Sequence, residues 1–83
     1  MKPERGTLIK EAITLLQGIA PELEADMLTP GQPLRQQLDL DSMDWLNFLI
    51  SLHQRYQVEI PESDYAKLRT LNDVADYLYA RLA

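Results

Sequence analysis

Apolar residues recur at helical spacing in three stretches of the chain. The first is TLIKEAITLLQGIA, residues 7–20. Its main apolar stripe consists of Leu8, Ala12, Leu15, Leu16 and Ile19, with Ile9, Ile13 and Ala20 beside it. This periodicity predicts an amphipathic helix. Pro21 follows directly, and because a proline disfavours helical geometry at the residue before it, the helix should end there.

The second and third helical stretches lie in the other half of the chain. SMDWLNFLISLHQRY, residues 42–56, forms the second predicted helix. The last helix should begin at Thr70, because Asp73 three residues later completes the pattern of a capping box. Its apolar stripe consists of Leu71, Val74, Ala75, Leu78 and Leu82.

The segment between these two helices contains the breaker Pro61, after which ESDYAKL, residues 62–68, can form one or two helical turns. Tyr56, Val58 and Ile60 alternate as in a short strand, but no partner strand is indicated elsewhere. We therefore reject a strand here.

Residues 21–41 form a long connection between the first two helices and contain Pro21, Pro30, Gly31 and Pro33. A loop of about twenty residues is unusual in a compact domain and is commonly functional. Leu28, Leu34 and Leu38 are expected to hold it against the core. The predicted fold is all-α: one domain over residues 1–83, a small bundle of three principal helices plus one short helix, with the long loop between the first two.

Composition narrows the possible functions. The chain has 8 basic and 13 acidic residues, a net charge of −5, which argues against nucleic-acid binding. It has no cysteine and one histidine, His53, so a thiolate site or a two-histidine metal motif is excluded. No signal-peptide block or membrane-spanning stretch is visible, and we expect a soluble cytoplasmic protein without membrane insertion.

Acidic residues are concentrated before and at the start of the second helix. Between residues 22 and 44 the chain has one base, Arg35. The acids of this segment are Glu22, Glu24, Asp26, Asp39, Asp41 and Asp44. Such a segment is either a solvated face or one that steers the protein toward basic partner surfaces.

Ser42 stands at the start of the second helix between two carboxylates. A serine there is commonly an N-cap. Asp41, however, can cap the helix, and Asp44 then lies at the third helical position as a box-like partner. Ser42 is left at the first helical position with a free hydroxyl. Capping alone stays possible, but a helix start also favours anions, so modification by a phosphate-bearing group is the alternative.

Two other roles for this segment are rejected. A serine nucleophile needs an adjacent base, whereas His53 lies eleven residues along the same helix, roughly 16 Å away. A calcium loop beginning at Asp39 lacks an oxygen ligand at Met43 and has Ile50 where the final glutamate belongs. We therefore predict no catalytic residue and no metal site.

The apolar arc of the second helix is wider than a core-facing stripe requires. At about 100° per residue it covers roughly 200°, with Met43 and Ile50 at its edge, near Ser42. These two residues are either ordinary exposed apolar side chains or part of a surface that docks on a partner.

Taken together, DSM at residues 41–43, VEIP at 58–61 and TLNDVADYL at 70–78 resemble acyl carrier proteins in order and spacing. The resemblance covers nearly the whole chain. It implies a carrier, not an enzyme, whose Ser42 is esterified with 4′-phosphopantetheine and whose thioester cargo is held on the thiol of that arm. It also implies that Asp41 is recognised by a phosphopantetheinyl transferase, which acts with magnesium and coenzyme A.

The resemblance also implies further partners. These are an acyl or aminoacyl ligase and acyl-transferring enzymes, and we expect the carrier to be monomeric. The acidic segment and the apolar arc described above offer Asp39, Asp44, Met43 and Ile50 as candidate docking residues. LDSM is similar to D-alanyl carrier proteins as well, so an aminoacyl cargo stays open. A carrier-fold interaction domain that is never loaded is a further alternative.

The chain departs from the family pattern at three places. Asp39 stands where glycine is common, and aspartate tolerates left-handed geometry better than most residues. The family's second helix is usually rich in glutamate, whereas here Asn47, His53, Gln54 and Arg55 follow Asp44. Trp45 is larger than the expected residue, which argues against a roomy acyl cavity.

Overall fold

The computed structural model describes residues 3–82, and these contain helices and no strand. Three helices are long, and three short helical segments lie in the connections between them. In chain order the elements are α1 (Arg5–Ile19), η1 (Ala25–Met27), α2 (Leu34–Gln37), α3 (Ser42–Tyr56), η2 (Glu62–Lys67) and α4 (Leu71–Arg81). The all-α bundle of three principal helices predicted from the sequence is confirmed.

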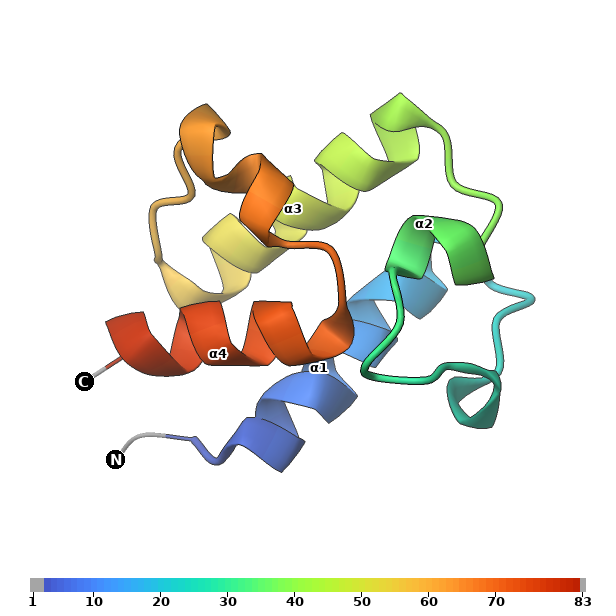
Figure 1. The fold of residues 1–83 in the computed structure, drawn as a ribbon, viewed down its shortest axis with the longest axis horizontal. Coiled ribbons are helices and arrows are strands. Elements are labelled where there is room, and N and C mark those ends of the chain that lie inside the picture. Colours follow the sequence, from blue (N-terminus) through green and yellow to red (C-terminus); the bar gives the residue numbers. More distant parts are fainter. Residues whose placement is uncertain (1–2, 83) are drawn as a thin grey trace.

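The core lies where α1 packs against both α3 and α4 (Figure 1). The predicted stripes supply it: Leu8 and Leu16 from α1, Leu52 from α3 and Leu78 from α4 are buried. The long connection contributes as well, since Leu28 and Leu34 are buried and Leu38 is partly buried against the same cluster. The fully buried side chains that fill this interior are Leu8, Leu16, Leu34, Phe48, Leu49, Leu52, Leu68, Leu71, Val74 and Leu78.

Two boundaries differ from the sequence prediction. α1 begins at Arg5, two residues earlier than expected, because Arg5 forms an ion pair with Asp76 of α4 at 2.6 Å and Leu8 N–H bonds to Glu4 C=O. The connection over 21–41 is not a plain loop, since it includes η1 and α2. Segments of three and four residues are too short to produce a recognisable period.

Helix caps account for the starts of α3 and α4. Thr70 caps α4 and forms a complete capping box with Asp73, as predicted. Asp41 caps α3. α3 ends at Tyr56, and the next residue, Gln57, has a left-handed φ of 56°, which is a common way for a helix to stop.

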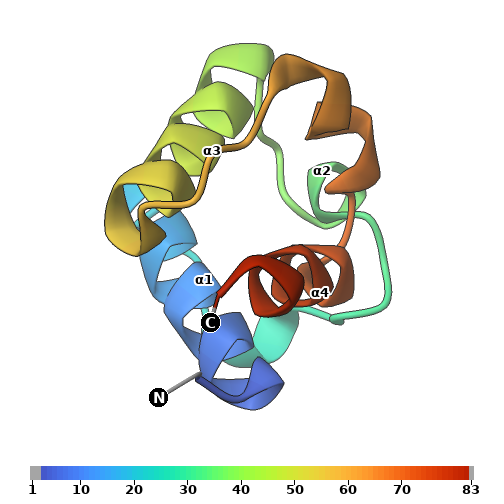
Figure 2. The same cartoon turned by 90° about the vertical axis from the view of Figure 1, so that its left-hand side faces the viewer.

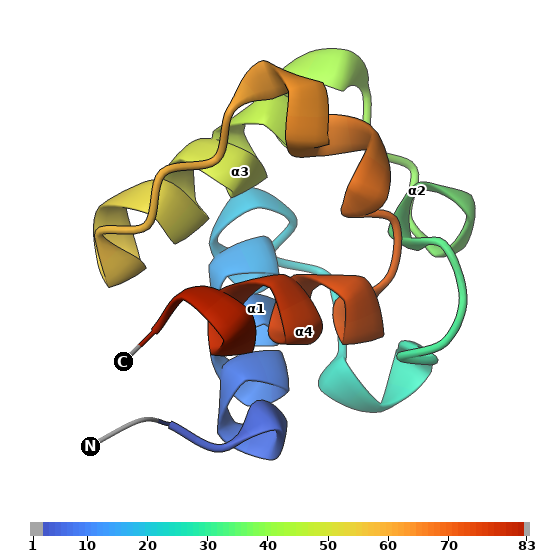
Figure 3. The same cartoon turned by 60° about the vertical axis from the view of Figure 1, so that its left-hand side comes forward.

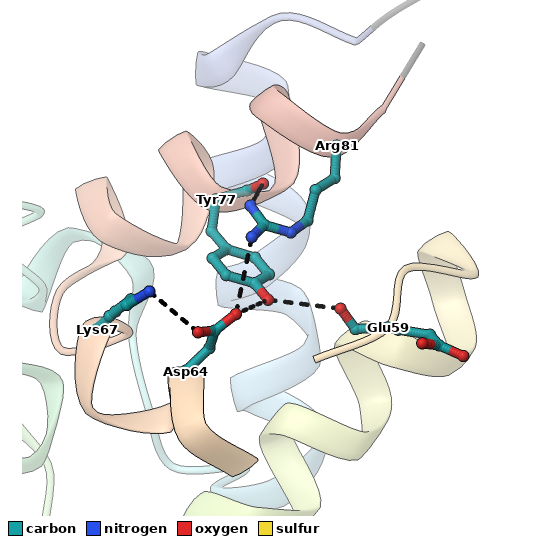
Figure 4. Close-up of polar contacts among 5 residues, drawn as sticks. All are labelled: Glu59, Asp64, Lys67, Tyr77 and Arg81. Carbon is teal, nitrogen blue, oxygen red and sulfur yellow. Dashed lines mark hydrogen bonds and ion pairs between the residues drawn. The ribbon is translucent and has the colours of Figure 1, made fainter. Parts of the chain in front are cut away.

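Polar contacts around Asp64, rather than buried side chains, hold η2 against α4 (Figure 4). The Tyr77 hydroxyl donates to the Asp64 carboxylate at 2.7 Å, and Lys67 pairs with it at 3.1 Å. These two contacts, the tyrosine first, lower the pKa of Asp64. The Arg81 guanidinium lies 3.5 Å over the Tyr77 ring and 3.7 Å from the carboxylate. η2 is thereby kept beside α3, and Figure 2 shows it there.

Candidate functional site: the start of α3

Ser42 is the first residue of α3 and is exposed. The preceding residue provides the cap: the Asp41 carboxylate accepts the backbone N–H of Asp44 at 2.8 Å. No side chain of the described residues hydrogen-bonds the Ser42 hydroxyl. Asp44 lies at the expected third position, but the return bond that would complete a box is not formed at this helix start. The Ser42 hydroxyl is therefore not needed for capping.

The surroundings of Ser42 fit an attached phosphate group. The backbone N–H groups of Ser42 and Met43 have no partner among the described residues. Free amides and the positive end of the helix dipole favour an anion at this position. Asp39, Asp41 and Asp44 are the nearby acids in sequence, and of these Asp41 is engaged by the cap.

The turn before the helix differs from the expectation for Asp39. Among the described non-glycine residues only Gln57 has positive φ, so Asp39 does not adopt left-handed geometry. Instead, Leu40 N–H bonds to Leu38 C=O at 2.9 Å and closes a three-residue turn. Leu40 is buried, and its burial fixes the direction in which the chain enters α3. Asp39 stays exposed.

Ser42 lies on the rim of an open groove between α3 and η2. The groove is lined by Arg35, Ser42, Trp45, Leu46, Leu49, Glu62 and Tyr65. These residues come from α2, α3 and η2, and Figure 3 shows the chain turning back from the end of α3 and running through η2 along the same side of the molecule. Trp45 forms part of the wall and packs on Phe48 with ring centroids 5.4 Å apart.

The sequence did not indicate the three residues outside α3 that line this groove, which are Arg35, Glu62 and Tyr65. Arg35 is recognisable in the sequence as the one base among six acids, but nothing in the pattern places it near Ser42. Glu62 and Tyr65 lie in η2, whose position depends on the contacts of Asp64.

Met43 and Ile50 are exposed, as the sequence predicted, at 65% and 42%. They lie seven positions apart on α3, hence near one face at about 10 Å along the axis. Ile50 also lines a separate groove together with His53, Ile60 and Tyr65. Exposed apolar side chains beside a helix start form a surface that a partner protein can bury.

The part of the chain that the structure describes has no group of three or more His, Cys, Asp or Glu residues arranged to hold a metal ion. His53 bonds through Nδ1 to the Val58 carbonyl at 2.9 Å. Within residues 3–82 no helix is long and apolar enough to span a membrane.

Comparison with known proteins agrees with this site. Residues 12–78 match the family described as "Phosphopantetheine attachment site", which defines the chain as a domain of that class. The acyl carrier protein of Syntrophobacter fumaroxidans is 32% identical over 68 residues, covering 80% of this chain and 84% of that protein. The acyl carrier protein of Thermosynechococcus vestitus is 30% identical over 67 residues, covering 78% and 83%.

A mycobacterial relative is longer. The meromycolate extension acyl carrier protein of Mycobacterium leprae is 34% identical over 70 residues, 84% of this chain, which spans 57% of the length of that relative. The family match and these relatives together show that the chain belongs to the acyl carrier protein family. Its prosthetic group is 4′-phosphopantetheine.

Proposed function

We propose that Ser42 carries the phosphopantetheine arm and that the protein holds acyl groups as thioesters on it and passes them to partner enzymes. The observation that carries this proposal is the division of labour at the start of α3. Asp41 caps the helix through a 2.8 Å bond, and the exposed Ser42 hydroxyl is left for the transferase. The arm supplies a terminal thiol, which is where the thioester forms.

The chain's own residues position the arm and contribute no catalysis. The free N–H groups of Ser42 and Met43 lie where the phosphodiester would be attached, and Asp41 orients this helix start for the transferase and its magnesium. We propose that the chain is a single monomeric domain over residues 1–83 that works in the cytoplasm. Its partners are then the transferase, an acyl or aminoacyl ligase, and acyl-transferring enzymes.

Partner docking is proposed to combine apolar contact with local charge. Met43 and Ile50 present apolar surface, and Asp39, Asp41 and Asp44 add negative charge near Ser42. Buried apolar area supplies affinity, whereas exposed charges mainly steer the approach of a basic partner.

An acyl cargo is favoured over an aminoacyl cargo by the names of the relatives. All three relatives compared are named acyl carrier proteins, and the name of the mycobacterial one adds meromycolate extension. A D-alanyl or other aminoacyl carrier remains the alternative, to be separated by the mass of the thioester isolated from cells.

The test is co-expression with a broad-specificity phosphopantetheinyl transferase, followed by intact mass and peptide mapping. We expect the mass of one phosphopantetheine on the peptide containing Ser42. Ser42→Ala should remove this gain. Ser51→Ala is the matched control, because Ser51 lies on the same helix but its hydroxyl bonds to the Asn47 carbonyl at 2.9 Å. Absence of the added mass with several transferases would instead support an unloaded interaction domain.

A further inference from the structure

Another groove, different from the one lined by Ile50 and His53, adjoins the Ser42 groove. Its charged lining residues are basic, which is unusual in this acidic chain. It is lined by Pro33, Arg35, Gln36, Trp45, Tyr65, Ala66, Leu68 and Arg69. These lining residues include two arginines and no acid, although the chain has 13 acidic against 8 basic residues. The two grooves share Arg35, Trp45 and Tyr65 and are therefore continuous.

The backbone brings the two arginines together. Leu34 N–H donates to the Arg69 carbonyl at 2.8 Å, so the residue before Arg35 is bonded directly to Arg69. Asn72 N–H donates to the Pro30 carbonyl at 3.0 Å and fastens the same two segments a second time. Two backbone hydrogen bonds thus join the segment around α2 to the segment at the start of α4, and Arg35 and Arg69 line one groove in spite of their separation in sequence.

These two guanidinium groups have no partner in the described part of the chain, whereas the other three are paired. Arg5 pairs with Asp76, Arg55 with Glu11 and Arg81 with Asp64. Glu62 lines the Ser42 groove with Arg35 but forms no ion pair with it. The unpaired positive charge of the described arginines is therefore gathered on one groove, next to the Ser42 groove.

We propose that this arginine groove receives a carboxylate at the far end of an acyl group carried on the Ser42 arm, so that the preferred cargo is a dicarboxylic acid joined through one carboxyl. This inference rests on the proposed attachment at Ser42. Trp45 and Tyr65 offer aromatic walls for the apolar part of the chain. Guanidinium groups bind a carboxylate through paired N–H donors, which a neutral acyl end cannot accept.

Tethering explains why the ligand is cargo rather than a free anion. Ion pairs of exposed arginines are individually weak, too weak to retain a small carboxylate from solution. A carboxylate attached at Ser42 does not have to be recruited from solution, because the arm begins on the adjoining groove, so each ion pair acts as an intramolecular contact. The weak pairs then suffice to bias where the cargo lies.

The direct test compares three forms of the 83-residue chain that carry the arm with the apo form as reference: the holo form, the pentanoyl-loaded form and the glutaryl-loaded form. A broad-specificity transferase prepares each from coenzyme A or the matching coenzyme A thioester. Relative to the apo form, we expect the Nε–H resonances of Arg35 and Arg69 to shift in the glutaryl form and to stay in place in the holo and pentanoyl forms. Arg5 and Arg81 are internal controls and should not respond.

A second measurement uses attack of hydroxylamine on the thioester. Glutaryl release should be slower than pentanoyl release by about two- to fivefold at low salt, the range that one exposed ion pair supplies. Arg35→Gln or Arg69→Gln should abolish this difference. Lys10→Gln is the matched control, because Lys10 is exposed, forms no ion pair with another described residue and lies on α1. It should leave the difference unchanged.

Three results would overturn the inference. Equal release rates and equal spectra for the two cargoes would show that the groove does not bind the carboxylate of the cargo. If the resonances of Arg35 and Arg69 shift as much in the holo form as in the glutaryl form, the groove binds the phosphodiester of the arm and not the cargo. Loss of the difference in Lys10→Gln would assign it to overall charge. Failure of the proposed function is separate, since it appears beforehand as no mass gain on Ser42.

Discussion

The guanidinium of Arg55 lies 2.9 Å from the carboxylate of Glu11 and ties α3 to α1. The Tyr56 hydroxyl donates to the same carboxylate at 3.0 Å. The contact with Glu11, followed by a contact with Tyr56, raises the pKa of Arg55. In the sequence, Arg55 lies on the polar face of the second predicted helix. In the fold, its side chain connects α3 to α1. It is therefore not free to act in partner docking.

This contact separates two substitutions that would otherwise both test docking. Arg55→Glu should lower the free energy of unfolding, because it places a second carboxylate beside Glu11. Asn47→Glu should leave stability nearly unchanged, since Asn47 is exposed, and should improve recognition by fatty-acid synthesis enzymes with basic docking surfaces. Urea denaturation and acyl-transfer rates check both. Equal stability of the two variants would contradict the structural role of Arg55.

Ser42→Ala should abolish attachment of the arm while leaving the fold intact. Asp41 still caps α3 in this variant, so the free energy of unfolding should change by less than about 1 kcal/mol. Thermal melting by circular dichroism, together with intact mass, measures both properties. A large drop in melting temperature would mean that Ser42 has a structural role.

Asp41→Ala should be more destabilising than Ser42→Ala and should also impair loading. It removes the bond to Asp44 N–H and a negative charge at the positive end of α3, together worth roughly 1–2 kcal/mol. Asp41→Asn is the matched variant, because it keeps a capping oxygen but loses the charge. If Asp41→Ala melts like Ser42→Ala and loads normally, Asp41 does not have the role assigned to it.

Docking should depend more on apolar contact than on salt. Truncating Met43 or Ile50 to alanine should slow transfer to the cognate enzyme, at about 25 cal/mol for each Å² lost from the interface. Exposed charge pairs are screened over about 10 Å at 0.1 M salt, so a salt series isolates the contribution of the acids. If neither truncation changes the transfer rate and the rate falls steeply with salt, docking depends on the charges of Asp39, Asp41 and Asp44 and not on apolar contact.

Stability should fall at alkaline pH because of Tyr56. Burial first, and then the hydrogen bond to Glu11, raise the pKa of Tyr56 from 10.0 to about 12. The folded chain therefore keeps the phenol proton where the unfolded chain has lost it. Its contribution is complete below pH 10.0 and is lost as pH rises toward about 12. Urea denaturation from pH 9 to 11, on the order of the Tyr reference pKa, should show a shallower decline for Tyr56→Phe.

Tyr56→Phe should not remove the alkaline decline completely. Burial, followed by the hydrogen bond to Asp64, also raises the pKa of Tyr77, which adds stability loss in the same direction. An identical slope in wild type and Tyr56→Phe would show that the contact with Glu11 is not maintained in solution.

Local sequence determined the helices and the helix start that carries the proposed site. The bounds 42–56, the Asp41 cap, the Thr70–Asp73 box and the exposure of Met43 and Ile50 were all readable from the chain. Each depends on residues within one or two turns of one another, through apolar periodicity or a hydrogen bond between near neighbours. The free hydroxyl of Ser42 follows from the same local geometry.

Tertiary structure alone decided which distant side chains surround that helix start. Arg35 and Arg69 share a groove because Leu34 is bonded to the Arg69 carbonyl, and Tyr65 reaches the grooves because Asp64 holds η2 against α4. Arg55 meets Glu11 because α1 packs on α3. These contacts depend on how the long connection and η2 pack on the core. A segment without a regular apolar period gives no sequence pattern from which its path could be predicted.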